Sequence, residues 1–319
     1  MENHELETFF SQKLCALQNQ KVVIGFSGGA DSTALLLLFY KFAPQYNIDL
    51  SAAHFNHQWR TSAIIDQQFC ENLCKELNVP LVIGFADQHQ SKNHGSQEAN
   101  ARAKRHQFFA QFTDSVIAMA HHQDDQLENF FIKLIRGCSL EGAAKITENT
   151  QIGKLKIFRP LLEIKKIDLI NYLNQNKITH VEDPTNQDNK YLRNKIRNSL
   201  LPKLAECDDR GSKNILNFMQ KINDVQDYLA QTVVELDIIN NQQLNLDNWQ
   251  KAAPIIQQEA LKKWLFINGY SGHVSTKLIT EISRFLMNSK SLSHQITPIF
   301  FIKKNKKTIT VSTTNCIDN

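Results

Sequence analysis

The amino-acid sequence predicts an α/β protein: a Rossmann-like parallel sheet with helices on both faces, followed by a mainly helical domain. Two observations predict the sheet. Short apolar runs alternate with amphipathic helical patterns over the first 120 residues of the 319-residue chain, and polar stretches follow several of these runs. This alternation is typical of βαβ units, whose parallel strands end at one edge of a sheet, where ligands bind.

Each strand and helix of the predicted sheet follows from the spacing of apolar residues. Four runs have the length and composition of buried strands, namely residues 22–26, 50–55, 81–85 and 116–120. Amphipathic patterns separate them at residues 32–41, 62–77 and 97–112. A further helix is expected at about 124–138, where Leu127, Phe131 and Leu134 share one face. Polar stretches beginning at Ser27, His54 and His121 each follow a strand, so we expect them at one edge of the sheet.

Beyond about residue 213 the pattern changes to helices without alternating strands. Helices are expected at residues 215–236, 255–267 and 274–287, and a β-hairpin with the lysine-rich turn "KKNKK" at 299–311. The polar stretch "ECDDRGSK" at 206–213 separates the two patterns. We therefore expect one domain at residues 1–210 and a second at 211–319.

The bulk composition predicts a soluble, cytoplasmic protein with a sizeable core and no membrane partner. Hydrophobic residues make up 42% of the chain, no apolar run near the start could cross a bilayer, and the N-terminus lacks the pattern of a secretory signal. The net charge of +4 tolerates a polyanionic partner without requiring one. None of the six cysteines forms a Cys-x-x-Cys pair, so we expect reduced thiols, with Cys70 and Cys74 buried on one helix.

The stretch "SGGADS", which begins at Ser27, connects the first predicted strand to the first predicted helix. Gly28 and Gly29 allow positive φ and a close approach of a ligand to the backbone. Successive amide groups and the helix N-terminus form an anion site, and Ser27 and Ser32 add hydroxyl groups. The stretch matches neither the Walker A nor the dinucleotide pattern. It therefore predicts a phosphate cradle of another kind.

Asp31 lies inside this cradle, although a carboxylate repels phosphate. A divalent cation between them removes the repulsion, and Mg²⁺ prefers carboxylates together with substrate phosphate oxygens. The alternative is that Asp31 only caps the helix. The serine and glycines before it, with a strand behind them, favour the metal ligand.

The loop resembles the pyrophosphate-binding loop of the N-type ATP pyrophosphatases, a superfamily with the adenine nucleotide alpha hydrolase-like fold. Its members cleave ATP between the α and β phosphates. Later motifs resemble the tRNA(Ile)-lysidine synthetase family in order and spacing, over roughly residues 20–205. They include "RPLL" from residue 159, and the most specific are "AHHQDDQLENFFIKLIRG" from residue 120 and "YLRNKIRNSLLP" from residue 191 together.

The resemblance implies a ligase that uses ATP and Mg²⁺ to join L-lysine to a tRNA. Such enzymes adenylate the C2 oxygen of the wobble cytidine in the CAU anticodon of tRNA(Ile), and the ε-amine of lysine then displaces AMP to give lysidine. Two alternatives stay open: a related tRNA thiolase, and a nucleotide-binding module without catalysis. The sequence leaves the oligomeric state open, a homodimer included.

The resemblance also implies nucleotide and metal contacts. The expected nucleotide-binding residues are Ser27, Gly28, Gly29, Ala30, Asp31, Ser32, His54 and His57. The expected metal ligands are Asp31 and Asp125, with Asp124 as a neighbour, and the expected catalytic residues are Asp31, Asp125 and Arg105. The structural alternative for "HHQDD" is that its carboxylates only stabilise the N-terminus of a helix through the helix dipole. This role and metal binding can hold at the same time. For the two histidines, packing or adenine contact is favoured over a metal.

A second implied set would contact lysine or tRNA. It comprises Arg102, Glu128, Glu141, Arg193, Asn194 and Arg197. Asp125, Glu128 and Glu141 are the alternatives for the carboxylate that deprotonates lysine. For the arginines the alternatives are surface salt bridges and clamps on ATP or tRNA phosphates, of which the clamps are favoured. The hairpin lysines, Lys303, Lys304, Lys306 and Lys307, suit either a tRNA contact or a solvated turn.

Overall fold

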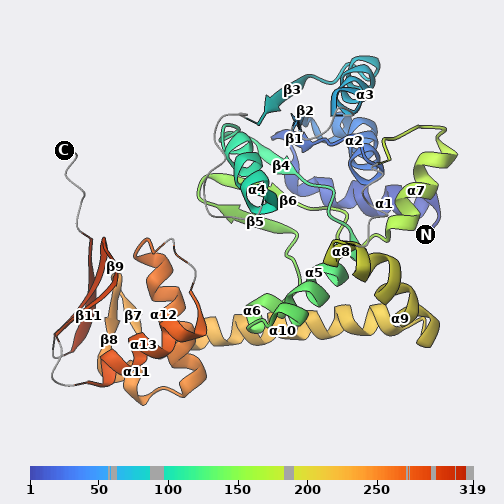
Figure 1. Cartoon of the computed structure of the whole chain (residues 1–319). Coiled ribbons are helices and arrows are strands. Elements are labelled where there is room, and N and C mark those ends of the chain that lie inside the picture. Colours follow the sequence, from blue (N-terminus) through green and yellow to red (C-terminus); the bar gives the residue numbers. More distant parts are fainter. Residues whose placement is uncertain are drawn as a thin grey trace. The chain divides into compact units, whose positions relative to one another are not determined.

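The computed structural model divides the chain into two compact units, Met1–Met219 and Gln220–Asn319 (Figure 1). It describes residues 1–56, 58, 63–86, 97–182, 190–270, 272, 274–288, 292–305 and 307–313, with the backbone alone at 97–102. No helix in these ranges combines the length and the apolar character that a membrane crossing requires.

A six-stranded sheet with the order β3-β2-β1-β4-β6-β5 forms the centre of the first unit. Its strands are β1 (Lys21–Gly25), β2 (Asp49–Asn56), β3 (Leu81–Phe85), β4 (Val116–Ala118), β5 (Asn149–Ile152) and β6 (Leu155–Phe158). All neighbours run parallel except β5, which pairs antiparallel with β6. The predicted fold class is confirmed, and the four expected strands are β1 to β4.

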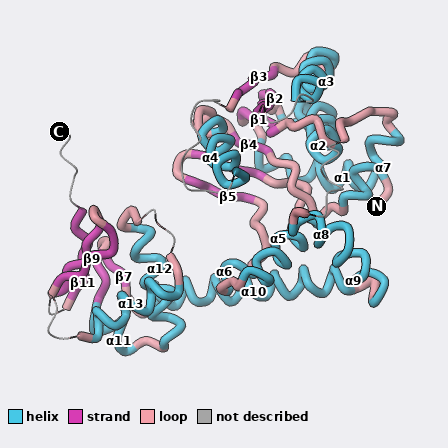
Figure 2. The backbone as a smooth tube through the Cα atoms, viewed as in Figure 1, coloured by secondary structure: helices cyan, strands magenta, loops and turns pink. Residues whose placement is uncertain are grey.

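Helices cover both faces of this sheet (Figure 2). The helices before residue 211 are α1 (Asn3–Leu14), α2 (Ala30–Phe42), α3 (Ala63–Glu76), α4 (Gln97–Phe109), α5 (Gln123–Arg136), α6 (Leu140–Ala143), α7 (Lys166–Gln175), α8 (Leu192–Lys195) and α9 (Leu201–Cys207), of which α1, α2, α3 and α7 pack on one face and α4 on the other. Side chains of β1 alternate between the faces: Val22 and Ile24 pack with α1, α2, α3 and α7, whereas Val23 packs with α4. The buried Phe10 and Phe39 meet edge to face at 5.2 Å. This packing fixes α2, and with it the loop that precedes it.

The second unit combines helices with an antiparallel sheet. Helix α10 (Gly211–Glu235) contains the boundary between the units and is followed by α11 (Leu246–Lys251), α12 (Pro254–Ile267) and α13 (Thr276–Met287). The strand order is β7-β8-β11-β10-β9, with β7 (Ile239–Asn240), β8 (Gln243–Asn245), β9 (Ser293–Thr297), β10 (Phe300–Lys304) and β11 (Thr308–Thr313). The expected hairpin is β10 and β11. The other three strands were not predicted, because they are short and largely polar.

Lys304 of β10 differs from the other hairpin lysines. Its side chain is buried, and its ammonium group donates to the main-chain oxygens of Phe285, Leu286 and Asn288 at the end of α13. It therefore caps a helix. The sequence had suggested a tRNA contact or a solvated turn for this lysine, and both alternatives are wrong for Lys304. Lys303 and Lys307 are exposed, and Lys306 lies outside the described residues.

Candidate active site

Polar side chains from three strands meet at the carboxyl edge of the six-stranded sheet. The glycine-rich loop follows β1, His54 lies near the end of β2, and the pair His121 and His122 follows β4. Because β1 pairs directly with β2 and with β4, these segments are neighbours in space. The edge is the position at which open parallel sheets bind ligands.

Gly28 gives the loop its shape. Its φ is +84°, and an added Cβ would lie 3.2 Å from the sulfur of Cys70 and 3.3 Å from the side chain of Val181. Its carbonyl accepts hydrogen bonds from the Val181 amide (2.9 Å) and from the Thr33 hydroxyl (3.2 Å). A side chain at this position would combine a strained φ with close contacts. The Gly28 carbonyl thus ties the loop to α2 through Thr33 and to a later segment of the chain through Val181.

Two serine hydroxyls complete the loop. The Ser27 amide donates to Ser32 Oγ (3.2 Å), and Ser32 Oγ donates to the Gly29 carbonyl (3.0 Å). The hydroxyls of Ser27 and Ser32 lie 3.1 Å apart. Helix α2 begins at Ala30, so its unpaired amides and positive dipole end lie at the loop. The geometry is that of an anion cradle.

His122 is the centre of a cluster of carboxylates beside the loop. Only 1% of its side chain is exposed. Its Nε2 lies 3.5 Å from Asp31 Oδ2 and 3.4 Å from Asp125 Oδ2, and its Nδ1 lies 3.5 Å from Asp124 Oδ2. The His122 amide also donates to Asp125 Oδ2 at 3.0 Å, which caps α5. One imidazole thus contacts acidic residues from two helices.

The electrostatics of the cluster make His122 a cation. Burial acts against protonation, but the nearby carboxylates of Asp124, Asp31 and Asp125 raise the pKa of His122 to about 10. Burial likewise acts to raise the pKa of Asp31, but His122 and the charges of Lys166 and other cations lower it overall. The carboxylate of Asp31 therefore stays ionised beside the phosphate cradle.

Asp31 and Asp125 are suited to hold a magnesium ion. Asp31 Oδ1 is buried and has no hydrogen-bond partner among the described residues. Asp124 differs, because its Oδ2 accepts the Lys166 amide at 2.8 Å and so caps α7. The described residues contain no group of three His, Cys, Asp or Glu side chains arranged around a metal position. Mg²⁺ needs only one or two carboxylates when substrate phosphates supply the other oxygens, so two aspartates fit it.

Glu128 and Arg197 form a buried ion pair next to this cluster. Glu128 is fully buried, and Arg197 donates to both its carboxylate oxygens, at 2.6 and 3.1 Å. Arg193 Nε lies 3.4 Å from Glu128 Oε2, and its NH2 group donates to Asn129 at 2.8 Å. Arg197 belongs to a π-helical turn, Ile196–Leu200, a local irregularity often found at functional sites. Helix α5 thus fixes the guanidinium groups that were predicted for ATP or tRNA.

His121 has a different environment from that of its neighbour. Burial and the charges of Arg159 and Arg105 lower the pKa of His121 to about 4, although Asp125 opposes them. Its ring is therefore neutral at physiological pH, while the ring of His122 is charged. Two adjacent buried histidines thus differ in charge because three carboxylates outweigh the cost of burial at His122, whereas Asp125 alone does not outweigh it at His121.

The remaining predicted residues lie at several places. His54 is buried, and its Nδ1 lies 2.9 Å from the Phe26 carbonyl, so it supports the base of the loop. Asn194 is buried in α8. Glu141 is exposed in α6 and accepts a hydrogen bond from Ser139. Arg105 is exposed on α4. His57 and the side chain of Arg102 lie outside the described residues.

Four residues of this edge were not predicted from the sequence: His121, His122, Arg159 and Lys166. The doubled histidine before two aspartates was a signal for the first two, but it was interpreted only through its acidic residues. Arg159 follows β6, and its NH1 group donates to the Thr147 carbonyl at 3.0 Å. Lys166 begins α7, and its position beside Asp31 becomes visible only once the helices are packed.

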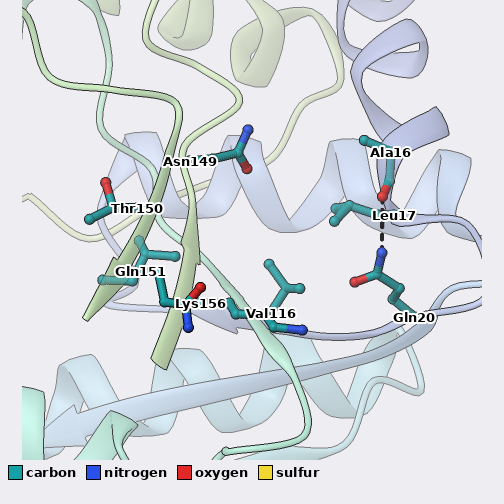
Figure 3. Close-up of a pocket in the computed structure, with 9 residues that line it drawn as sticks. Ala16, Leu17, Gln20, Val116, Asn149, Thr150, Gln151 and Lys156 are labelled. Carbon is teal, nitrogen blue, oxygen red and sulfur yellow. Dashed lines mark hydrogen bonds between the residues drawn. The ribbon is translucent and has the colours of Figure 1, made fainter. Parts of the chain in front are cut away.

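A pocket of about 470 Å³ lies at the opposite, amino edge of the sheet (Figure 3). Its walls include Val116, the first residue of β4, and Lys156 of β6. Gln20, just before β1, donates to the Ala16 carbonyl at 2.9 Å within this wall. No two oppositely charged side chains face each other there, unlike at the carboxyl edge, so we assign the site to the loop and His122.

Comparisons with known proteins place the first unit in a family. Residues 2–204 match the family model described as "PP-loop domain". A tRNA(Ile)-lysidine synthase of Actinobacillus succinogenes is 36% identical over 200 residues, which cover 62% of this chain and 46% of that protein. One of Nitrosomonas europaea is 31% identical over 280 residues, covering 86% of this chain and 60% of the relative. The chain thus spans about half the length of the curated relatives it matches.

The fold of the chain resembles that of a solved structure. The U34-tRNA thiolase NcsA from Methanococcus maripaludis, described with its [4Fe-4S] cluster, aligns with a TM-score of 0.58 over 69% of this chain and 78% of that one. The sequence identity is 16%, so the likeness concerns the fold alone.

Proposed function

The chain belongs to the PP-loop domain family, and we propose that it ligates L-lysine to C2 of the wobble cytidine in the CAU anticodon of tRNA(Ile), with ATP as the energy source. The observation that carries the proposal is the ionised Asp31 inside an anion cradle, with an unpartnered buried oxygen among the described residues. The relatives named tRNA(Ile)-lysidine synthase support the choice of reaction. The products are lysidine, AMP and pyrophosphate.

The reaction proceeds in two balanced displacements. The O2 atom of the cytidine attacks the α-phosphorus of ATP, an O–P bond forms, and pyrophosphate leaves. The ε-amine of lysine then attacks C2, a C–N bond forms, and AMP leaves with the former carbonyl oxygen. The attacking nitrogen loses a proton in this second step, so a base is required.

The residues of the carboxyl edge have separate tasks in this reaction. The amides of the loop and of the start of α2 bind the phosphates. Asp31 and Asp125 would hold Mg²⁺, which offsets the negative charge of the phosphates when it is bound. His122 keeps both carboxylates in place, because its Nε2 lies within 3.5 Å of each. Arg197, fixed by Glu128, offers a guanidinium group to the nucleotide or the tRNA backbone.

Of the three carboxylates considered for deprotonating lysine, Asp125 lies nearest the cradle, and it would serve as the base only where Asp31 alone holds the metal ion. Glu128 already binds two guanidinium groups and is fully buried, and Glu141 is an exposed side chain paired with Ser139. The Asp125 side chain is 17% exposed, and its carboxylate lies beside the His122 ring, as that of Asp31 does. It can therefore meet a substrate at the cradle.

The two alternative functions have less support. A thiolase has the fold likeness in its favour, but the likeness stops at the fold, and the sequence has no Cys-x-x-Cys pair. Cys70 and Cys74 are buried, and burial raises the pKa of both thiols, which makes them poor nucleophiles. A nucleotide-binding module without catalysis has no need for the buried ion pair of Glu128 and Arg197.

We place the reaction in the cytoplasm and assign tRNA binding in part to residues 211–319. The exposed lysines of the β10–β11 hairpin, Lys303 and Lys307, are positioned for phosphate contacts. A homodimer remains compatible with this assignment. None of these three points is needed for the chemistry at the carboxyl edge.

A labelling experiment tests the proposed reaction. Purified protein is given ATP, Mg²⁺, labelled lysine and a panel of tRNA transcripts. We expect label only in the tRNA(Ile) transcript with the CAU anticodon, and none when its wobble cytidine is replaced by uridine. Pyrophosphate release without transfer of lysine, or incorporation of sulfur from a sulfide donor, would contradict the proposal.

A further inference from the structure

Lys166 is a cation at the phosphate cradle that the sequence did not reveal. It is the first residue of α7, and its Nζ lies 3.8 Å from Asp31 Oδ2. Its main-chain amide donates to Asp124 Oδ2 at 2.8 Å, so its backbone is fixed independently of its side chain. The start of α7 thus holds the backbone of Lys166 beside the cradle, within reach of its ammonium group.

The two cations beside Asp31 differ in their freedom to move. The His122 ring is 1% exposed, and carboxylates surround it on both sides. The Lys166 side chain is 32% exposed and carries its charge on a flexible four-carbon stem. His122 is therefore a fixed part of the site, whereas Lys166 can change its partner.

We propose that Lys166 is a phosphate-binding residue: it neutralises Asp31 in the free protein and binds the β- and γ-phosphates of ATP once a divalent cation has taken its place at Asp31. This role rests on the proposed function of the site. A metal ion held by Asp31 would repel the ammonium group and would leave Lys166 without its counter-ion. The triphosphate tail then provides the nearest strong acceptor, and lysine commonly binds phosphate as a point charge.

The exchange solves a problem of charge at this edge. Asp31, Asp124 and Asp125 would repel a triphosphate approaching the loop, and His122 offsets only part of their charge. Lys166 keeps the site closer to neutral before the nucleotide arrives and contributes to binding afterwards. Lys165 has no such contact, since it is exposed and forms no ion pair with the cluster among the described residues.

Equilibrium binding of a non-cleavable nucleotide tests this role. The probes are an ATP analogue with a methylene group between the α- and β-phosphates, with Mg²⁺, and AMP. In the full chain, Lys166→Met should weaken binding of the analogue about 10–100-fold and leave AMP binding unchanged. Lys166→Arg should retain most of the affinity, and the matched control Lys165→Met should bind both probes like the wild type.

The variants should fold normally, because the hydrogen bond to Asp124 uses the backbone of residue 166, and thermal unfolding checks this. Unchanged binding of the analogue by Lys166→Met, or an equal loss for AMP, would overturn the role. If the wild type does not bind the analogue, both the nucleotide site and this role are wrong. If it binds the analogue but transfers no lysine to tRNA, the proposed reaction alone fails.

Discussion

The two units of the molecule bury charge in different ways. In the first unit Glu128 and His122 are almost fully buried, and each faces side chains of opposite charge from other elements. In the second unit Lys304 is buried against main-chain oxygens at the end of α13, with the Phe285 and Leu286 oxygens at 3.2 and 3.3 Å. In the first unit, buried charged side chains pair with side chains of opposite charge. In the second unit, the buried charge of Lys304 pairs with the main-chain oxygens at a helix end.

The difference separates a binding site from a structural contact. Lys304 saturates its donors with carbonyl oxygens and with the negative end of a helix dipole, so it has nothing left for a ligand. The first unit leaves Asp31 Oδ1 without a partner among the described residues and holds Lys166 only at 3.8 Å. On our proposal, this incomplete pairing would allow Asp31 and Lys166 to exchange partners when a nucleotide binds.

Removal of Asp31 should give the largest effect. Asp31→Ala deletes the carboxylate that we assign to the metal, so lysidine formation should fall about 10³-fold or more, as with other electrostatic groups at reacting phosphates. Turnover is measured together with thermal unfolding, which should stay near that of the wild type. The control is Asp114→Ala, at an exposed aspartate before β4. Near-normal turnover of Asp31→Ala would remove the metal role.

Neutralising Glu128 should destabilise the first unit strongly. Glu128→Gln leaves the guanidinium of Arg197, which is 24% exposed, without its counter-ion, at an expected cost of about 1–3 kcal/mol of unfolding free energy. The matched control is Glu163→Gln, because Glu163 is 58% exposed and its pair with Lys13 is 3.4 Å long. That control should cost below about 1 kcal/mol in denaturant unfolding. Equal losses in both variants would erase the distinction between buried and exposed pairs.

The second unit should respond to loss of its buried charge in stability alone. Lys304→Met leaves the oxygens at the end of α13 unpaired, at an expected cost of about 1–3 kcal/mol in unfolding free energy. The exposed neighbour provides a control, Lys303→Met, which should lie within about 0.5 kcal/mol of the wild type. ATP-analogue affinity should be unchanged in both variants. A large loss of nucleotide binding in Lys304→Met would show that the buried charge of the second unit also supports the nucleotide site of the first.

The charge of His122 should produce an effect on stability that depends on pH. The pKa of His122 is raised to about 10 from an ordinary value near 6.5 in the unfolded chain. The stabilisation is therefore fully present below about pH 6.5 and is lost as the pH rises through 10. The melting temperature of the wild type, minus that of His122→Asn, should shrink by up to about 10 degrees between pH 6.5 and 10. A constant difference would mean that His122 is neutral in the fold.

Much of the fold was predictable because its signals are local. The apolar runs that became β1 to β4 and the glycines at 28 and 29 lie within short windows of sequence. The short strands β7 and β8 carry no such signal, since Gln243 becomes strand only by pairing with Asn240 of β7, and Asn245 only by pairing with Thr308 of β11. Local patterns therefore fix the first unit better than the second.

The site was predictable only in part, because charge states depend on distant neighbours. The sequence pointed to Asp31 and Asp125, which lie in recognisable motifs. It did not show that His122 would be charged and His121 neutral, since the carboxylates and guanidinium groups responsible come from several elements. Nor did it show Lys166, whose contact with Asp31 exists only after α7 has packed beside α2.

The hydrogen bond from the Val181 amide to the Gly28 carbonyl has a consequence for biosynthesis. A ribosome makes the chain from its N-terminus, so the loop is synthesised long before the residue that closes it. The strand β1 can pair with β2 and β4 while translation continues, and Thr33 can already donate to the Gly28 carbonyl, but the hydrogen bond from Val181 forms only once that residue has emerged. The nascent protein therefore completes its cradle only after most of the first unit has been translated.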